Sequence, residues 1–106
     1  MDNTAFKDFI KLHRIIDRTY KHFWICFGNF KKENPEDFHE AFESGEKISL
    51  KLARVSLVMN YRFGGGEPIE HVQSTIDVYS EDIPVAEYHF LFTLDGLDMD
   101  DALSFF

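Results

Sequence analysis

The chain has 106 residues, of which 44% are hydrophobic and 16% are aromatic, and its formal net charge is −8. This length is usual for one domain and the apolar content is too high for a disordered segment, so we predict a single domain over residues 1–106. Cys26 is the only cysteine, which excludes an intramolecular disulfide and a cysteine-based zinc site. Neither a secretory leader nor an apolar run of roughly 20 residues is visible, so we expect a cytoplasmic protein with no membrane partner.

Charge is distributed unevenly along the chain. Residues 1–62 contain eleven bases and nine acids, whereas residues 63–106 contain ten acids and no base. A segment of that charge repels phosphates, so we do not expect direct binding of nucleic acid. The acidic part favours either a basic protein partner or solubility alone.

The N-terminal part has helical spacing. Apolar residues recur every three or four positions between Phe6 and Tyr20, which predicts a helix that starts at Thr4. The continuation over 21–30 is open at this point, because the aromatic and β-branched run Phe23–Phe27 suits a buried strand as well as a helix that ends at Gly28.

A second helix is predicted to begin at Asn34-Pro35. Asn is a good N-terminal cap, Pro is harmless at the first helical position, and the acids Glu36 and Asp37 suit the positive end of the helix dipole. Ser44-Gly45 is predicted to end this helix.

From Lys47 onward the apolar residues alternate, which is typical of strands. The phase of the alternation changes near Ala53, and a β-bulge would produce that change. Strands are predicted over 47–63, 70–79 and 86–94, with turns over 64–68 and 80–82. The alternation of the first two strands predicts an antiparallel register that buries Met59 and Val72 together. The expected cross-strand pairs are Met59 with Val72, Val55 with Ile76, and Arg54 with Asp77.

The acidic segment Asp95–Asp101 permits two interpretations. It resembles a cation-binding loop, but it lacks the Gly at the sixth position and the Glu at the twelfth that an EF-hand needs. We therefore predict a short helix that is capped by Asp98. The expected fold class is α+β, with N-terminal helices packed on one face of an antiparallel three- to four-stranded sheet and a short C-terminal helix.

No motif in the sequence points strongly to a metal site, a catalytic nucleophile or a phosphate-binding loop. His39 and Glu43 lie one helical turn apart, but two ligands do not make a metal site. Apolar neighbours argue against a reactive Cys26, and Gly64–Gly66 is not followed by the Lys of a phosphate-binding loop. We therefore expect no metal, no cofactor and no enzymatic activity.

One polar constellation stands out on the predicted sheet. Its members share the face opposite the apolar residues: His71, Gln73, Thr75, Asp77, Tyr79, Glu87, His89, Thr93, Arg54, Ser56 and Asn60. Paired histidines and carboxylates can perform acid–base chemistry. The same residues are also common on the solvated outer face of a sheet, where they have no function.

The leading hypothesis is a small acidic protein-binding or inhibitory module, of the size and charge of toxin-immunity and phage anti-defence proteins. It would present a negative surface to a basic, nucleic-acid-binding partner. The acids expected to form this surface are Glu81, Asp82, Asp95, Asp98, Asp100, Asp101, Asp77 and Glu87. The alternatives are a small enzyme or ligand-binding domain that uses His71, Asp77, Glu87 and His89, and a plain assembly subunit that forms a homo-oligomer.

Overall fold

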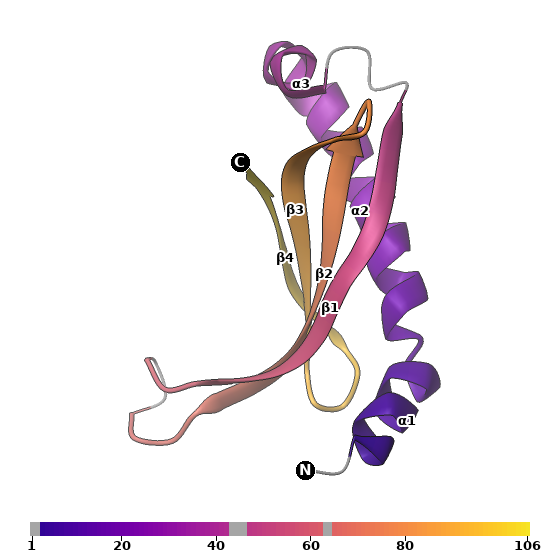
Figure 1. The fold of residues 1–106 in the computed structure, drawn as a ribbon. Coiled ribbons are helices and arrows are strands. Elements are labelled where there is room, and N and C mark those ends of the chain that lie inside the picture. The colour runs from indigo at the N-terminus through magenta and orange to yellow at the C-terminus, as the bar shows by residue number, and fades with distance from the viewer. Residues whose placement is uncertain (1–2, 43–46, 63–64) are drawn as a thin grey trace.

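A computed structural model describes residues 3–42, 47–62 and 65–106. Within these residues three helices precede a four-stranded antiparallel sheet in which the strand order is β1-β2-β3-β4 (Figure 1). The elements are α1 (Thr4–Leu12), α2 (Ile15–Glu33), α3 (Pro35–Phe42), β1 (Ile48–Asn60), β2 (Ile69–Ser80), β3 (Ile83–Phe92) and β4 (Asp98–Phe105). The predicted α+β class with N-terminal helices and an antiparallel sheet is confirmed. The described residues contain no helix that is both long and apolar enough to cross a membrane.

The predicted N-terminal helix is divided into two. Arg14 adopts a left-handed conformation with φ 52°, which separates α1 from α2. The new helix direction places Ile15, Thr19 and Phe23 on one stripe, and all three are buried against the sheet. The sequence left helix and strand as alternatives for segment 21–30, and the structure shows a helix. Helical geometry places Phe23 on the same buried stripe as Ile15.

Gly28 does not end this helix, which runs on to Glu33. The extra turn carries Phe30, whose ring lies 6.0 Å from that of Phe38 on α3. Packing between the two helices thus extends α2 past a residue of low helix propensity. The predicted start of α3 at Asn34-Pro35 is confirmed, whereas the end predicted at Ser44-Gly45 lies outside the described residues.

Helix α2, with α1 and α3 at its two ends, runs along one face of the sheet, which we call the helix face (Figure 1). Its strand residues and the helix residues that pack on them form the core: Ile15, Phe23, Phe38, Phe42, Val72, Ile76, Val78, Ala86, Tyr88, Phe90 and Phe92. The opposite face, which we call the open face, carries Gln73, Thr75, Asp77, Glu87 and His89. This division between apolar and polar faces follows the predicted alternation.

The predicted bulge is confirmed, since the β1–β2 register shifts between Leu52 and Arg54. The predicted register is wrong by two residues: Leu57, not Met59, lies opposite Val72. A shift of two residues returns each side chain to its own face, so the alternation could not distinguish the two registers. The observed register pairs Ile48 with Ser80, the last residue of β2, whereas the predicted one would have placed Ile48 against the following turn.

All three expected cross-strand pairs fail because of this shift, and Val55 lies opposite Ser74 instead of Ile76. Arg54 lies opposite Thr75, and Lys51 takes the position opposite Asp77. Met59 lies opposite Glu70 near the end of β1, and the residue is 48% exposed. At this end the β1–β2 hairpin bends away from the helices (Figure 1). Met59 is therefore not a core residue.

The predicted C-terminal helix is also wrong, because residues 98–105 form strand β4. Backbone pairing with the free edge of β3 outweighs the helical preference of the acidic segment. Leu103 lies opposite Tyr88 and Phe105 opposite Ala86, so both apolar side chains turn to the helix face. Asp98 consequently caps no helix. The preceding strand ends at Phe92 rather than at residue 94.

Candidate functional site

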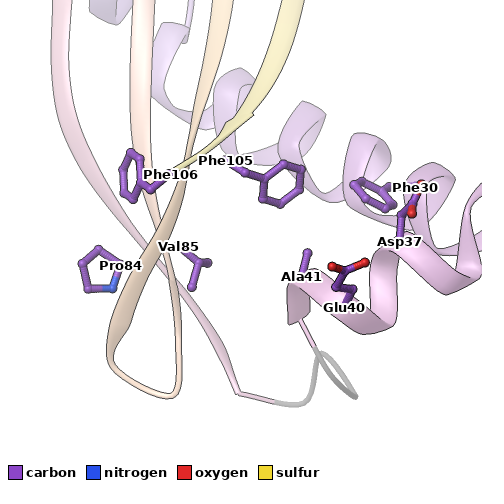
Figure 2. A pocket seen from close by; sticks show the side chains of 8 residues that line it. All are labelled: Phe30, Asp37, Glu40, Ala41, Pro84, Val85, Phe105 and Phe106. Carbon is purple, nitrogen blue, oxygen red and sulfur yellow. The ribbon is translucent and has the colours of Figure 1, made fainter.

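A pocket of about 560 Å³ lies where α3 meets the end of β4 and the start of β3 (Figure 2). Its walls come from four elements: the consecutive helices α2 and α3, and the strands β3 and β4, which are distant from them in the sequence. The lining residues are Phe30, Asp37, Glu40, Ala41, Pro84, Val85, Phe105 and Phe106.

The apolar wall of the pocket follows from the packing of α2 on α3. Phe30 is the last aromatic residue of α2, and the chain then reverses at Asn34 to place α3 beside it. The ring of Phe105 lies 5.7 Å from that of Phe30 and 5.5 Å from that of Phe42, so β4 joins the same aromatic cluster. Ala41 lines the pocket from α3 with a single methyl group (Figure 2). Phe105 and Phe106 remain 44% and 73% exposed, which leaves apolar surface available to a ligand.

Carboxylates flank this apolar surface on the α3 side (Figure 2). Asp37 and Glu40 are exposed on the first two turns of α3. A second, smaller hollow shares Glu40, Ala41 and Val85 with the pocket and adds Glu81 from the β2–β3 turn. No Lys or Arg is among the described residues that line either hollow. We call the two hollows together the acid-rimmed pocket. Such a site suits a ligand that combines apolar and cationic groups.

The open face brings part of the predicted polar constellation together. Nδ1 of His89 lies 3.0 Å from the Thr75 hydroxyl and 3.2 Å from the Gln73 amide nitrogen, and Nε2 lies 3.3 Å from a Glu87 oxygen. Since the nitrogen of the Gln73 amide can only donate, Nδ1 of His89 is the acceptor, and the proton of the ring lies on Nε2, next to Glu87. The order carboxylate, imidazole, hydroxyl resembles a catalytic triad, but the Thr75 side chain is completely buried and cannot reach a substrate.

The other residues of the alternative enzyme site stay apart from His89. Asp77 lies opposite Glu87 and Lys51, in the neighbouring row of the open face. His71 is buried opposite Val58, and its Nδ1 has no hydrogen-bond partner among the described residues. The contacts of His89 with Gln73, Thr75 and Glu87 therefore hold its ring in one tautomer, and they offer no accessible nucleophile.

The eight acids of the predicted partner surface do not form one surface. Glu81 and Asp82 lie at the α3 end of β3, whereas Asp95 lies at its opposite end (Figure 1). Asp77 and Glu87 belong to the open face. Asp98, Asp100 and Asp101 lie on β4, and only Asp100 of these is directed to the open face.

Asp98 and Asp101 are engaged within the fold. Asp98 forms an ion pair with Arg18 and lies 3.2 Å from Nε2 of His22, both on α2. Arg18 also donates hydrogen bonds to the backbone oxygens of Gly96, at 2.7 Å, and of His13, at 3.0 Å. Sequence reasoning missed this contact between α2 and β4, because it required residues 98–105 to be a strand.

Cys26 lies on the same side of α2 as this ion pair. Partial burial, and then the negative charge of Asp101, raise the pKa of its thiol. The pKa of Tyr88 is also raised, by burial, by the hydrogen bond to Asp101 and by the Asp101 charge. Both groups are therefore protonated at neutral pH, which is the opposite of what a nucleophile needs. Among the described residues, no three His, Cys, Asp or Glu side chains are grouped so that they could hold a metal ion.

Comparison of the chain with protein-family models, with curated proteins and with solved structures found no match.

Proposed function

We propose that the protein is a small protein-binding module that holds a basic segment of a partner protein in the acid-rimmed pocket. The observation that carries this proposal is the combination of exposed aromatic walls with three carboxylates, Asp37, Glu40 and Glu81, and no lining base among the described residues.

An Arg or Lys side chain fits both parts of such a pocket. Its aliphatic stem packs on aromatic rings such as Phe30 and Phe105, while its charged end reaches the carboxylates at the opening. Aromatic side chains are enriched at the centres of protein interfaces, and charged groups are typical of their rims. The proposed site has this anatomy.

Inhibition is the mode of action that we propose for this binding. Basic segments are the parts of proteins that contact nucleic-acid phosphates. A domain with a net charge of −8 that occupies such a segment competes with the phosphates for the same cations. The protein would then block nucleic-acid binding by its partner without binding nucleic acid itself.

A pull-down from the native cell with matched charge variants tests the proposal. The double variant Asp37→Lys/Glu40→Lys reverses the rim, whereas Glu67→Lys/Asp95→Lys makes the same change of net charge at exposed positions away from the pocket. We expect a basic protein in stoichiometric amount with the wild type and with the remote variant, and its loss with the rim variant. Equal recovery by both variants would contradict the proposal.

A second variant tests the apolar wall without a change of charge. Ala41→Leu adds three carbon atoms to the wall of the pocket and suits a helix. We expect it to weaken partner binding while leaving the thermal unfolding temperature nearly unchanged. Unaltered binding would show that the partner does not enter the pocket.

A further inference from the structure

The two edge strands of the sheet carry opposite charges. β1 contains Lys51 and Arg54 and no acid, whereas β4 contains Asp98, Asp100 and Asp101 and no base. In the described part of the chain, β1 pairs only with β2 and β4 only with β3. Each strand therefore has one edge whose backbone groups are available for pairing with another strand.

The charges that are left without partners lie on the same face. Lys51 and Arg54 are exposed on the open face, and neither side chain forms a hydrogen bond or an ion pair with a described residue. Asp100 is exposed on the open face of β4, and within the described part of the chain its carboxylate accepts a hydrogen bond from the backbone N–H of Asp101 and forms no ion pair.

The helix faces of the two edges also match. Leu50 and Leu52 on β1 are half-buried, and Leu103 and Phe105 occupy the equivalent face of β4. The N–H of Phe106 donates to the Val85 oxygen, so by the alternation of antiparallel pairing the N–H groups of Phe105 and Leu103 point away from β3. Pairing at this edge would extend the apolar layer and satisfy these donors.

We propose that β1 of a second copy of this chain pairs with β4 and continues the antiparallel sheet. Ile48 of the second copy lies beside Phe105 and Leu50 beside Leu103, so that apolar residues meet on the helix face. The bulge at Ala53 then places Arg54 of the second copy beside Asp100 on the open face. The interface uses two different surfaces of the protein, so each added copy presents a new free edge.

Charges on edge strands can also serve only to prevent such pairing. The two roles differ in what charge reversal does. If Arg54 and Asp100 attract each other between copies, reversing one of them breaks the interface, and reversing both in separate copies restores it. If the charges merely protect the edges, no combination of reversed chains associates better than the wild type.

Sedimentation velocity over a range of protein concentrations tests the proposal. We expect the wild type to associate more strongly as concentration rises and less strongly as salt rises. Arg54→Glu and Asp100→Arg should each weaken association by about tenfold, since like charges would then face each other. An equimolar mixture of the two variants should recover association, because every contact in an alternating assembly again joins opposite charges.

Circular dichroism of each variant shows whether it is folded, so a loss of association can be distinguished from a loss of structure. A wild type that stays monomeric at all concentrations would overturn the proposal, as would a mixture of folded variants that does not recover association. The inference is independent of partner binding: Ala41→Leu should leave self-association unchanged, and Arg54→Glu should leave partner recovery in the pull-down unchanged.

Discussion

The hydroxyl of Tyr88 donates a hydrogen bond of 2.6 Å to a carboxylate oxygen of Asp101, and this bond joins β3 to β4 beneath α2. Tyr88 is completely buried, so its hydroxyl needs a partner within the fold. The bond explains why an acidic segment lies against an otherwise apolar face of the sheet. Variants of Tyr88 and Asp101 can therefore measure how much this bond between β3 and β4 contributes to stability.

Loss of this bond should destabilise the protein. We expect Tyr88→Phe to lower the free energy of unfolding by about 1.5–3 kcal/mol, the range typical of a hydrogen bond to a charged group. Asp101→Asn keeps an acceptor oxygen and should cost less than Asp101→Ala. Urea unfolding of the variants measures the differences. Equal losses for the Asn and Ala variants would show that the acceptor oxygen at this position is unimportant.

Stability should fall at alkaline pH, partly because of Tyr88. Its pKa is raised in the folded state, so the folded protein keeps a proton that the unfolded chain releases above about pH 10. The unfolded state then binds fewer protons, and the free energy of unfolding decreases as pH rises through this window. Tyr88→Phe lacks this contribution and should lose less stability between pH 8 and pH 11. The same decline in both proteins, measured by urea unfolding at the two values, would contradict the assignment.

Two glycines should respond in opposite ways to alanine. Gly28 lies within α2 with no atom near the position of an added Cβ, so Gly28→Ala should stabilise the protein by about 0.5–1 kcal/mol. Gly96 has φ 81°, and a Cβ there would overlap the imidazole ring of His13. Gly96→Ala should therefore destabilise by about 1–3 kcal/mol. Urea unfolding of the two variants measures the difference, and a stabilising Gly96→Ala would contradict the left-handed conformation of Gly96.

The Cys26 thiol should react slowly in the folded protein. Partial burial and the charge of Asp101 raise its pKa, so less thiolate is present at pH 8 than in an unfolded chain. We expect Ellman's reagent to modify the native protein more slowly than the urea-unfolded one, and Asp101→Asn to increase the native rate. A native rate equal to the unfolded one would exclude this environment for Cys26.

Much of the fold was predictable from local pattern. The alternation of residues 47–63 with its phase change identified the bulge beside Ala53 and divided the sheet into an apolar and a polar face. The register was not predictable, because a shift of two residues preserves that division. Strand β4 was not predictable either: Asp98–Asp101 favours a helix start, and the strand depends on the edge of β3 and on Tyr88, which are distant in sequence.

The site was less accessible to sequence reasoning than the fold. The charge asymmetry drew attention to the acids after Arg62, yet two of the three rim carboxylates, Asp37 and Glu40, lie on α3. Asp37 was assigned only to the start of a helix, and Glu40 belongs to no motif in the sequence. The packing of Phe105 against Phe30 of α2 and Phe42 of α3 brings β4 to these helices and creates the hollow that the carboxylates flank.

The association rate of the captured basic partner, measured at low and at physiological salt, tests the proposed function most directly. Opposite charges accelerate association, and salt screens them with a Debye length of about 8 Å at physiological ionic strength. We predict that Asp37→Lys/Glu40→Lys associates more slowly than the wild type at low salt and loses most of the salt dependence, while Glu67→Lys/Asp95→Lys behaves nearly as the wild type. Equal rates for the wild type and the rim variant at both salt concentrations would contradict the account.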